Sequence, residues 1–269
     1  MSEILLCGYG AIGRRMAPEY EILGSLDIFD PNFHTQGFCI NERELKIFTA
    51  FESISSHYDF AILCLPTPTI DGKCDVSIVY DMVRRLQGVA DVIVIRSTIP
   101  VGTTNDLNCE FKNVIFCPEF YGATQHQVRN DYLILGGNRK LCNKFAQLYY
   151  KIKPADFKIK FYDNPSVAEM IKYMDNCFLA TKVVFCNSFA EACKKAKIEY
   201  DDVREGWLMD DRINPSHTIV YEEQPFYDSH CFNKDIPAFA NKFNDKFMKM
   251  VDEINTERKL TKIKKIVYN

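Results

Sequence analysis

Residues 1–162 alternate short apolar runs with amphipathic stretches. Seven runs are rich in Ile, Val, Leu and Phe: EILLCG, LDIFD, LKIFTAF, DFAILCLP, DVIVIRST, NVIFCPEF and YLILGG. Intervening stretches such as VSIVYDMVRRLQ have the amphipathic pattern of helices. Near-continuous apolar strands with helical connections are typical of a parallel sheet covered on both faces. The pattern predicts a doubly wound, mostly parallel α/β sheet over this region.

The pattern changes at residue 163. Residues 163–196 contain no strand-like run, and apolar side chains recur at helical spacing: Val167, Met170, Ile171, Met174 and Phe178. Asn164 or Ser166 can cap such a helix, and Pro165 suits its first turn. We expect a long helix that opens a helical domain over residues 163–269. Within it, residues 212–231 indicate an extended loop, and the last 30 residues indicate a charged helix.

Composition narrows the class of protein. The chain has 269 residues and a formal net charge of −3, which gives no general attraction to nucleic acid. The basic run RKLTKIKK is typical of a solvated helix end. No apolar run approaches the roughly 20 residues of a membrane span, and MSEILLCGYG lacks the basic start of a signal peptide. We expect a cytoplasmic protein that binds neither nucleic acid nor membrane.

The cysteines also indicate the redox state of the compartment in which the protein resides. Eleven is an odd count, with no CxxC pair, and many of them lie inside apolar strands and helices. That distribution is typical of reduced thiols that pack as small hydrophobic side chains. The five histidines are scattered singly, so we expect no metal site.

A glycine-rich turn, GYGAIG, follows the first apolar run and opens a helix. Its G-x-G-x-x-G spacing allows a tight turn and close approach of a pyrophosphate to the helix N-terminus. Asp30 ends the second run, where a carboxylate binds the ribose hydroxyls and repels a 2′-phosphate. This combination predicts a Rossmann-type domain that binds NAD rather than NADP; the alternative is an ordinary strand-turn-helix with a surface aspartate. The turn residues expected to contact NAD are Gly8, Tyr9, Gly10, Ala11, Ile12 and Gly13.

Three further motifs follow predicted strands: CLPTPTIDGKCDVS, VIRSTIPVGTT and FCPEF. In a doubly wound sheet, loops at the carboxyl ends of the strands border the ligand crevice. We therefore expect four polar side chains of these loops to project toward one site: Thr67, Ser97, Thr98 and Glu119.

These motifs are followed in order by EMIKYMDN, DDRI and CFNKD. From residue 3 to about residue 258 the chain resembles the UDP-glucose/GDP-mannose 6-dehydrogenase family. The resemblance implies oxidation of a sugar or nucleotide-sugar primary alcohol to a carboxylate, with two NAD reduced, as in polysaccharide biosynthesis. It also implies a homodimer formed through the central helices. The family's third domain, which holds the substrate's nucleotide, is expected to be absent from this chain.

The resemblance also implies roles for individual residues. Cys231 matches the nucleophile that forms a thiohemiacetal and then a thioester. Lys172 matches a lysine that stabilises oxyanions, aided by Asn176. Glu119 matches the residue that activates water for thioester hydrolysis, and Asp235 a carboxylate that positions water and Lys172.

The resemblance also implies contacts with the cofactor and with the substrate. Those expected with NAD, besides the glycine turn and Asp30, involve Leu65, Pro66, Thr67, Ser97, Thr98 and Lys234. Those expected with the substrate involve Glu119, Phe120, Tyr121, Lys172, Asn176 and Arg212. Arg212 matches an arginine that reaches a sugar across the dimer.

Spacing and local charge support part of this independently. Glu169, Lys172 and Asn176 share one helix face; the alternative is a surface ion pair between Glu169 and Lys172. Lys234 lies three residues after Cys231 and favours its thiolate. The alternative for Cys231 is one more inert thiol.

Two departures from the family pattern affect the substrate. Residues 222–230 contain no glycine where the family has a glycine-rich stretch, so we expect a differently shaped substrate loop. Ala123 stands where the family has a glutamate near the nicotinamide. Two other functions stay open: an NAD-binding homologue without catalysis, and a two-domain hydroxyacid-type dehydrogenase that does not use Cys231.

Overall fold

The computed structural model describes residues 1–33, 39–40, 43–120 and 131–267. The chain divides into two compact units. The first contains the described residues up to Lys172 except Thr69–Cys74, and the second contains Thr69–Cys74 and the described residues from Tyr173 onward. One helix, α5 (Pro165–Ala196), contributes to both units. The domain boundary expected at residue 163 therefore stays a prediction.

An eight-stranded sheet forms the centre of the first unit. Its order is β12-β11-β10-β9-β6-β1-β2-β5, and all neighbours are parallel except β10 and β11. The strands are β1 (Ser2–Cys7), β2 (Gly24–Phe29), β5 (Lys46–Phe48), β6 (Tyr58–Leu63), β9 (Ala90–Ile95), β10 (Val114–Phe116), β11 (Tyr132–Gly136) and β12 (Lys158–Tyr162). The predicted α/β fold is confirmed, and each of the seven apolar runs contains a strand. Three short elements lie outside this sheet in the first unit: β3 (Cys39–Ile40), β4 (Arg43–Glu44) and the 3-10 turn Phe51–Ser53.

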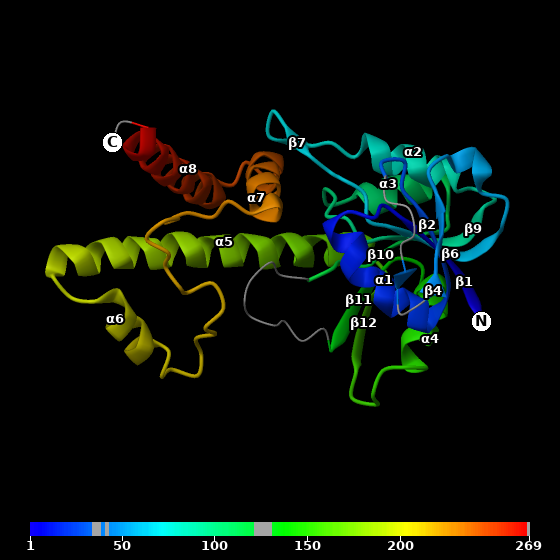
Figure 1. The fold of residues 1–269 in the computed structure, drawn as a ribbon, viewed down its shortest axis with the longest axis horizontal. Helices are drawn as coiled ribbons and strands as arrows, with labels where there is room; N and C mark the ends of the chain where they lie inside the picture. The colour runs from blue at the N-terminus through cyan, green and yellow to red at the C-terminus, as the bar shows by residue number, and fades with distance from the viewer. Residues whose placement is uncertain (34–38, 41–42, 121–130, 268–269) are drawn as a thin grey trace. The chain divides into compact units, whose positions relative to one another are not determined.

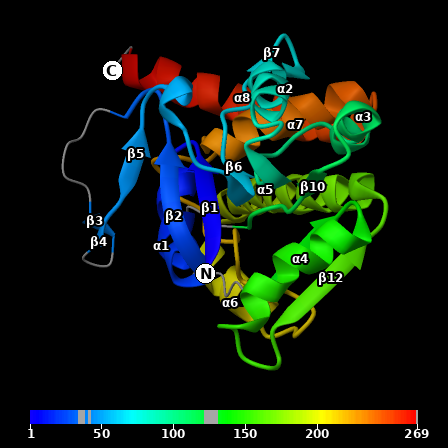
Figure 2. The same cartoon turned by 90° about the vertical axis from the view of Figure 1, so that its right-hand side faces the viewer.

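Helices cover both faces of this sheet (Figure 2). Ile4 and Leu6 of β1 pack in the cluster with α1 (Ala11–Leu23) and α4 (Arg139–Tyr150). Leu5 and Cys7 of the same strand pack with α2 (Ser77–Arg85) and α3 (Thr103–Glu110). Because successive strand residues point to opposite faces, an apolar strand supplies both layers.

The strand order reverses between β1 and β6. The chain runs outward from β1 through β2 to β5, and then from β6 through β9 to β10. Such a switch point opens a crevice outside the carboxyl ends of the two central strands, where ligands bind in doubly wound sheets. Gly8 directly follows β1, and Cys64 directly follows β6.

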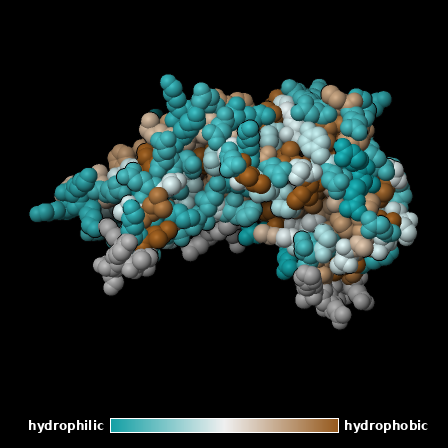
Figure 3. Space-filling model, turned by 90° about the horizontal axis from the view of Figure 1, so that it is seen from above, coloured by the Kyte–Doolittle hydropathy of each residue, from teal (hydrophilic) through white to brown (hydrophobic). Residues whose placement is uncertain are grey.

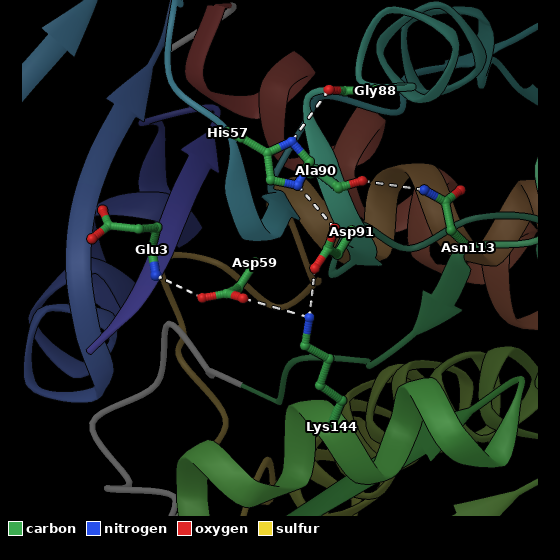
Figure 4. Close-up of polar contacts among 8 residues, drawn as sticks. All are labelled: Glu3, His57, Asp59, Gly88, Ala90, Asp91, Asn113 and Lys144. Atoms are coloured by element: carbon green, nitrogen blue, oxygen red, sulfur yellow. Dashed lines mark hydrogen bonds and ion pairs between the residues drawn. The ribbon is translucent and has the colours of Figure 1, made fainter.

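The opposite, amino ends of the strands carry an exposed charged network. Figure 4 shows Lys144 of α4 between two carboxylates, 2.7 Å from Asp91 and 3.5 Å from Asp59. Asp59 also accepts a hydrogen bond from the Glu3 amide at 3.1 Å. His57 places Nε2 2.9 Å from Asp91, and Nδ1 faces the Gly88 carbonyl. Both ring nitrogens face acceptors, an arrangement that the doubly protonated imidazolium satisfies.

The second unit is mostly helical (Figure 1). It contains most of α5 together with α6 (Tyr200–Trp207), α7 (His230–Lys242) and α8 (Lys246–Val267). A small apolar core joins α5, α7 and α8: Cys177, Ala180, Val184, Tyr227, Phe232, Ile236, Ala240, Met248 and Val251. The long helix is confirmed; its first turn is capped by Asn164, whose Oδ1 accepts from the Ser166 amide at 3.1 Å.

A hairpin between β6 and α2 belongs to this second unit. It comprises β7 (Thr69–Ile70) and β8 (Lys73–Cys74). Asp71 and Gly72 have φ values of 49° and 70°, as a two-residue hairpin turn requires. The Thr69 hydroxyl donates to the Lys234 carbonyl at 2.6 Å, and Asn241 Nδ2 donates to the Gly72 carbonyl at 3.2 Å. Two hydrogen bonds therefore hold the hairpin against α7.

The surface combines polar and scattered apolar residues. On the face drawn in Figure 3, hydrophilic residues predominate and hydrophobic residues lie between them. None of the helices among the described residues has both the length and the hydrophobicity to cross a membrane.

Candidate active site

The glycine turn after β1 leaves space at the N-terminus of α1. Gly8 has a φ of +93°, and a Cβ there would overlap the Cys64 carbonyl; a Cβ at Gly13 would overlap the Gly8 carbonyl. Gly10 caps α1 without a side-chain hydrogen bond and has nothing within 4 Å of an added Cβ. Helix N–H groups that face open space form an anion site. Ala11 and Ile12 form the first turn of this helix, so the turn fits a pyrophosphate.

Asp30 directly follows β2 and holds the glycine turn in place. Its Oδ2 accepts from the Tyr9 amide at 2.7 Å, and its Oδ1 accepts from the Asn32 amide at 2.8 Å. Each carboxylate oxygen can still accept a second hydrogen bond. The carboxylate therefore suits the predicted ribose contact and also fixes the turn, a role that the sequence did not reveal.

The loops after β6 and β9 are joined by hydroxyl groups. The Ser97 hydroxyl accepts from the Leu65 amide and donates to the Leu65 carbonyl, both at 2.8 Å. The buried Thr67 hydroxyl donates to the carbonyl of Thr98 at 2.8 Å. These hydroxyls shape the crevice wall. Direct contacts with NAD by these residues and by Pro66 stay predictions.

A buried ion pair joins the PEF motif to α5. Lys172 Nζ lies 3.4 Å from Glu119 Oε1, and the two side chains are 5% and 6% exposed. The same ammonium lies 5.2 Å from the centre of the Phe120 ring. Burying two charges is costly even when they are paired. A buried ion pair beside the carboxyl ends of the strands is therefore a candidate for chemistry rather than for stability.

Glu169, three residues before Lys172, caps α3. Its carboxylate accepts from the Gly102 amide at 2.5 Å and from the Thr104 amide at 2.8 Å, and the residue is fully buried. A carboxylate at a helix N-terminus complements the helix dipole. The alternative of a surface Glu169–Lys172 pair is therefore wrong, because Lys172 pairs with Glu119.

The second unit contains the other predicted catalytic residues. Asp235 is buried on α7; it accepts from Asn176 Nδ2 at 2.6 Å and from Lys234 Nζ at 2.5 Å. The hydrogen bond brings Asn176 and Asp235 together, whereas the expected roles of both residues beside Lys172 stay predictions. Lys234, expected at the cofactor, has its ammonium on Asp235, so a contact with NAD stays a prediction.

Cys231 lies in the first turn of α7. Ser229 caps this helix, and its hydroxyl accepts from the Phe232 amide at 3.1 Å. The Cys231 side chain is partly exposed. The S-H-C-F pattern contains the capping serine, a signal that could have placed the thiol at a helix start.

Several other cysteines have a different environment. Burial raises the pKa of Cys117 to about 11 and those of Cys64, Cys142 and Cys177 to about 12. These thiols are therefore protonated at neutral pH and pack as small hydrophobic groups, as predicted.

Arg212 is exposed, and its guanidinium hydrogen-bonds Asp210 in the same loop at 2.9 and 2.5 Å. Its predicted role across a dimer stays a prediction. Tyr121 and Ala123 lie outside the described residues.

The segment that replaces the family's glycines is fixed to α8. The Tyr227 amide donates to Asn255 Oδ1 at 2.8 Å, and Asn255 Nδ2 donates to the Tyr227 carbonyl at 3.0 Å. The Tyr227 hydroxyl donates to Asp252 at 3.0 Å. A buried side-chain amide thus occupies both backbone groups of Tyr227. This anchored segment is the part of the chain for which the sequence predicts a differently shaped substrate loop.

The glycine turn at the switch point, with Asp30 after the second strand, defines a dinucleotide-binding domain of the dehydrogenase type. The family models identify it further. The NAD binding domain of the UDP-glucose/GDP-mannose dehydrogenase family matches residues 24–153, and the central domain of that family matches residues 166–257. The chain belongs to the UDP-glucose/GDP-mannose dehydrogenase family. The expected cofactor, NAD, is confirmed with it.

Individual proteins support the same assignment. The UDP-glucose 6-dehydrogenase of Rickettsia prowazekii is 28% identical over 245 residues, which are 84% of this chain and 56% of that protein. The chain thus spans little more than half the length of this relative. The UDP-glucose dehydrogenase structure from Pyrobaculum islandicum has a TM-score of 0.78 at 22% identity, over 96% of this chain and 68% of that one.

A third match shares the fold with a different kind of enzyme. The 3-hydroxyisobutyrate dehydrogenase of Mycobacterium tuberculosis has a TM-score of 0.67 at 15% identity. The match covers 96% of this chain and 93% of that one.

Proposed function

We propose that this chain oxidises the primary alcohol of a sugar, in the form of a nucleotide sugar, to a carboxylate through a thioester on Cys231. The observation that carries the proposal is the buried Lys172–Glu119 pair at 3.4 Å. It places an ammonium beside a carboxylate on the motif that the family resemblance assigns to water activation.

NAD would be held by the glycine turn and the Asp30 carboxylate, and when bound it accepts the hydride removed in each oxidation. In the proposal, Cys231 adds to the aldehyde carbon after the first oxidation, and the thiohemiacetal carries the former carbonyl oxygen as a hydroxyl. The second oxidation gives the thioester. Water then cleaves the C–S bond, which releases the carboxylate and returns the thiol.

Each charged group has a part in this sequence. The Cys231 thiol lies in the first turn of α7, where the positive end of the helix dipole favours a thiolate. The Lys172 ammonium would stabilise the oxyanions that develop at the carbonyl carbon. Glu119 would accept the proton of the attacking water. Asp235 holds the Asn176 amide in place.

The test measures NADH and carboxylate together on a panel of sugars and nucleotide sugars. We expect two NADH per carboxylate. Cys231→Ala should abolish carboxylate formation without changing NAD affinity, whereas Cys109→Ala, which removes an exposed thiol elsewhere, should have no effect. A ratio of one NADH per product would contradict the thioester. NAD binding without turnover on any substrate would favour a homologue without catalysis.

A second candidate is a hydroxyacid-type dehydrogenase that does not use Cys231. The observation in its favour is the fold shared with 3-hydroxyisobutyrate dehydrogenase over nearly the whole of that chain. Cys231→Ser separates the two functions. It should retain near-full activity on a hydroxyacid under this second candidate, and lose carboxylate formation from a sugar under the first.

We also propose a homodimer formed through α5. Four large apolar side chains lie at spacings of four and seven residues along the helix and are exposed: Met174, Phe178, Phe185 and Phe189. A stripe of this kind is typical of an interface. Phe178→Lys should shift a sedimenting dimer toward the monomer, whereas Ile22→Lys, which changes an exposed side chain of α1, should not. A monomeric parent protein at micromolar concentration would exclude the dimer.

A further inference from the structure

The Cys231 thiol lies at the end of a long irregular segment. Residues 208–229, all of which the structure describes, contain no helix or strand between α6 and α7. Ser229 is the last of them, and it caps the helix that carries Cys231. The helix dipole acts mainly within the first turn, and a reacting group displaced by about 1 Å can react about 100-fold more slowly. The end of this segment therefore has to be fixed if the thiol is to keep its place.

Asn255 of α8 fixes the segment at Tyr227, two residues before the cap. Asn255 is 3% exposed, and Tyr227 is 4% exposed. The Asn255 Oδ1 accepts from the Tyr227 amide at 2.8 Å, and its Nδ2 donates to the Tyr227 carbonyl at 3.0 Å. One side-chain amide thus binds both backbone groups of one residue, which sets the position and the orientation of that residue.

Further contacts connect this anchored residue to the start of α7. The Tyr227 ring packs edge-on against the ring of Phe232, with centroids 5.6 Å apart, and Phe232 directly follows the thiol. The Asp228 carboxylate accepts from Asn233 Nδ2 of α7 and from Lys259 Nζ of α8, both at 2.6 Å. Two consecutive residues therefore link α8 to the first turn of α7.

We propose that Asn255 is a positioning residue that holds the Cys231 thiol at the start of α7. It acts through Tyr227 and the residues that follow it, and not on the substrate itself. The inference rests on the proposed function in that it takes Cys231 as the nucleophile. An asparagine that served the fold alone would stabilise the second unit without changing the reactivity of the thiol, so the two roles differ in a measurable way.

The first test measures alkylation of Cys231 by iodoacetamide as a function of pH, followed by mass spectrometry on the peptide that contains this thiol. In Asn255→Ala, we expect the midpoint of the pH profile to rise by about half a pH unit, because the thiol loses its fixed place at the helix start. An unchanged midpoint would overturn the proposal.

Asn187→Ala is the matched control. Asn187 is a buried asparagine of α5, and its Nδ2 donates to the Val183 carbonyl at 2.8 Å. Its replacement should leave the midpoint for Cys231 unchanged, even where it lowers the melting temperature. An equal rise in both variants would overturn the proposal, because it would show a general loosening of the second unit.

Turnover separates this inference from the proposed function. With a sugar substrate that the parent protein oxidises, Asn255→Ala should lower kcat by about 10- to 100-fold and leave the KM for NAD unchanged. A parent protein that oxidises no sugar would contradict the proposed function, and the alkylation profile would still decide the role of Asn255.

Hydrogen exchange in the parent protein gives a measurement that does not depend on a variant. The Tyr227 amide should exchange with deuterium as slowly as the buried amides of α7, because it is buried and bound by Asn255. Exchange as fast as that of the exposed Glu222 and Glu223 would overturn the proposal, whether or not Asn255→Ala folds.

Discussion

The charged side chains at the two ends of the parallel sheet differ in how far they are exposed to solvent. At the carboxyl ends, the Lys172 and Glu119 side chains are 5% and 6% exposed. At the amino ends, the His57, Asp91 and Lys144 side chains are 57%, 48% and 40% exposed. Desolvation opposes the buried pair, whereas solvent and salt screen the exposed network. Buried charge therefore indicates a chemical role, and exposed charge indicates a small adjustment of stability.

Replacing one lysine at each end should separate the two roles most strongly. Lys172→Met should lower the rate of sugar oxidation by about 10²–10³-fold, because the proposed mechanism uses this cation to stabilise an oxyanion. It should also destabilise the fold by about 3–5 kcal/mol, because Glu119 stays buried without its partner. Lys144→Met, at the exposed end, should leave the rate unchanged. Steady-state kinetics and denaturant unfolding measure both effects.

The double variant Lys172→Met/Glu119→Gln distinguishes chemistry from stability. Removing both charges should restore most of the stability, since no unpaired charge is left. The rate should stay low. Recovery of the rate together with stability would show that Lys172 acts only through the fold.

The buried Glu169 carboxylate, which caps α3, tests the contribution of a buried charge to stability at a residue without a proposed catalytic role. Glu169→Gln replaces an acceptor oxygen with an NH₂ group that faces the Gly102 or Thr104 amide. The loss of one charge-assisted hydrogen bond should destabilise the fold by about 1–3 kcal/mol. Glu52→Gln, whose side chain is 80% exposed, should change the free energy of unfolding by less than about 0.5 kcal/mol. Equal effects of the two variants in urea titrations would remove the contrast between buried and exposed carboxylates.

Substitutions of two glycines in the NAD turn should separate an effect on the stability of the fold from an effect on NAD affinity. Gly13→Ala should destabilise the fold by about 1–3 kcal/mol, because its Cβ would overlap the Gly8 carbonyl. Gly10→Ala has no such neighbour, so the fold should persist while NAD affinity falls. Calorimetric titration with NAD and thermal unfolding separate the two outcomes. Unchanged NAD affinity in Gly10→Ala would exclude the pyrophosphate from this space.

The sequence predicts most strands of the sheet. It predicts few of the hydrogen bonds and ion pairs around the candidate site. Continuous apolar runs identify seven strands, but β12 is an edge strand that alternates polar and apolar residues, and the apolar pattern alone does not reveal it. The hairpin turn at Asp71 and Gly72 carries a D-G signal that could have been used. Helix spacing placed Lys172 and Asn176 on one face of α5, but their partners depend on tertiary contacts.

The contacts of Glu169 illustrate this limit. Helical spacing suggests a local pair with Lys172, whereas the structure directs its carboxylate to the N-terminus of α3. No local pattern contains that information, because the two segments are distant in sequence. Likewise, the anchoring of Tyr227 by Asn255 depends on how the loop packs against α8.

The smallest effect should come from the pH dependence of the amino-end network. The hydrogen bond to Asp91 raises the pKa of His57 above 6.5, and Lys144 together with His57 lowers the pKa of Asp91 below 3.8. The His57 contribution is complete below its unfolded pKa and disappears as pH rises through the folded value. The Asp91 contribution is complete above its unfolded pKa and disappears as pH falls. The network should therefore stabilise most between about pH 4 and pH 6.5.

His57→Gln measures this window. It should destabilise the fold by a few tenths of a kcal/mol near pH 5.5 and by less near pH 8.5, because these charges are exposed and screened. High salt should shrink the difference. A pH-independent effect of His57→Gln would mean that the ring stabilises the amino ends by packing rather than by charge.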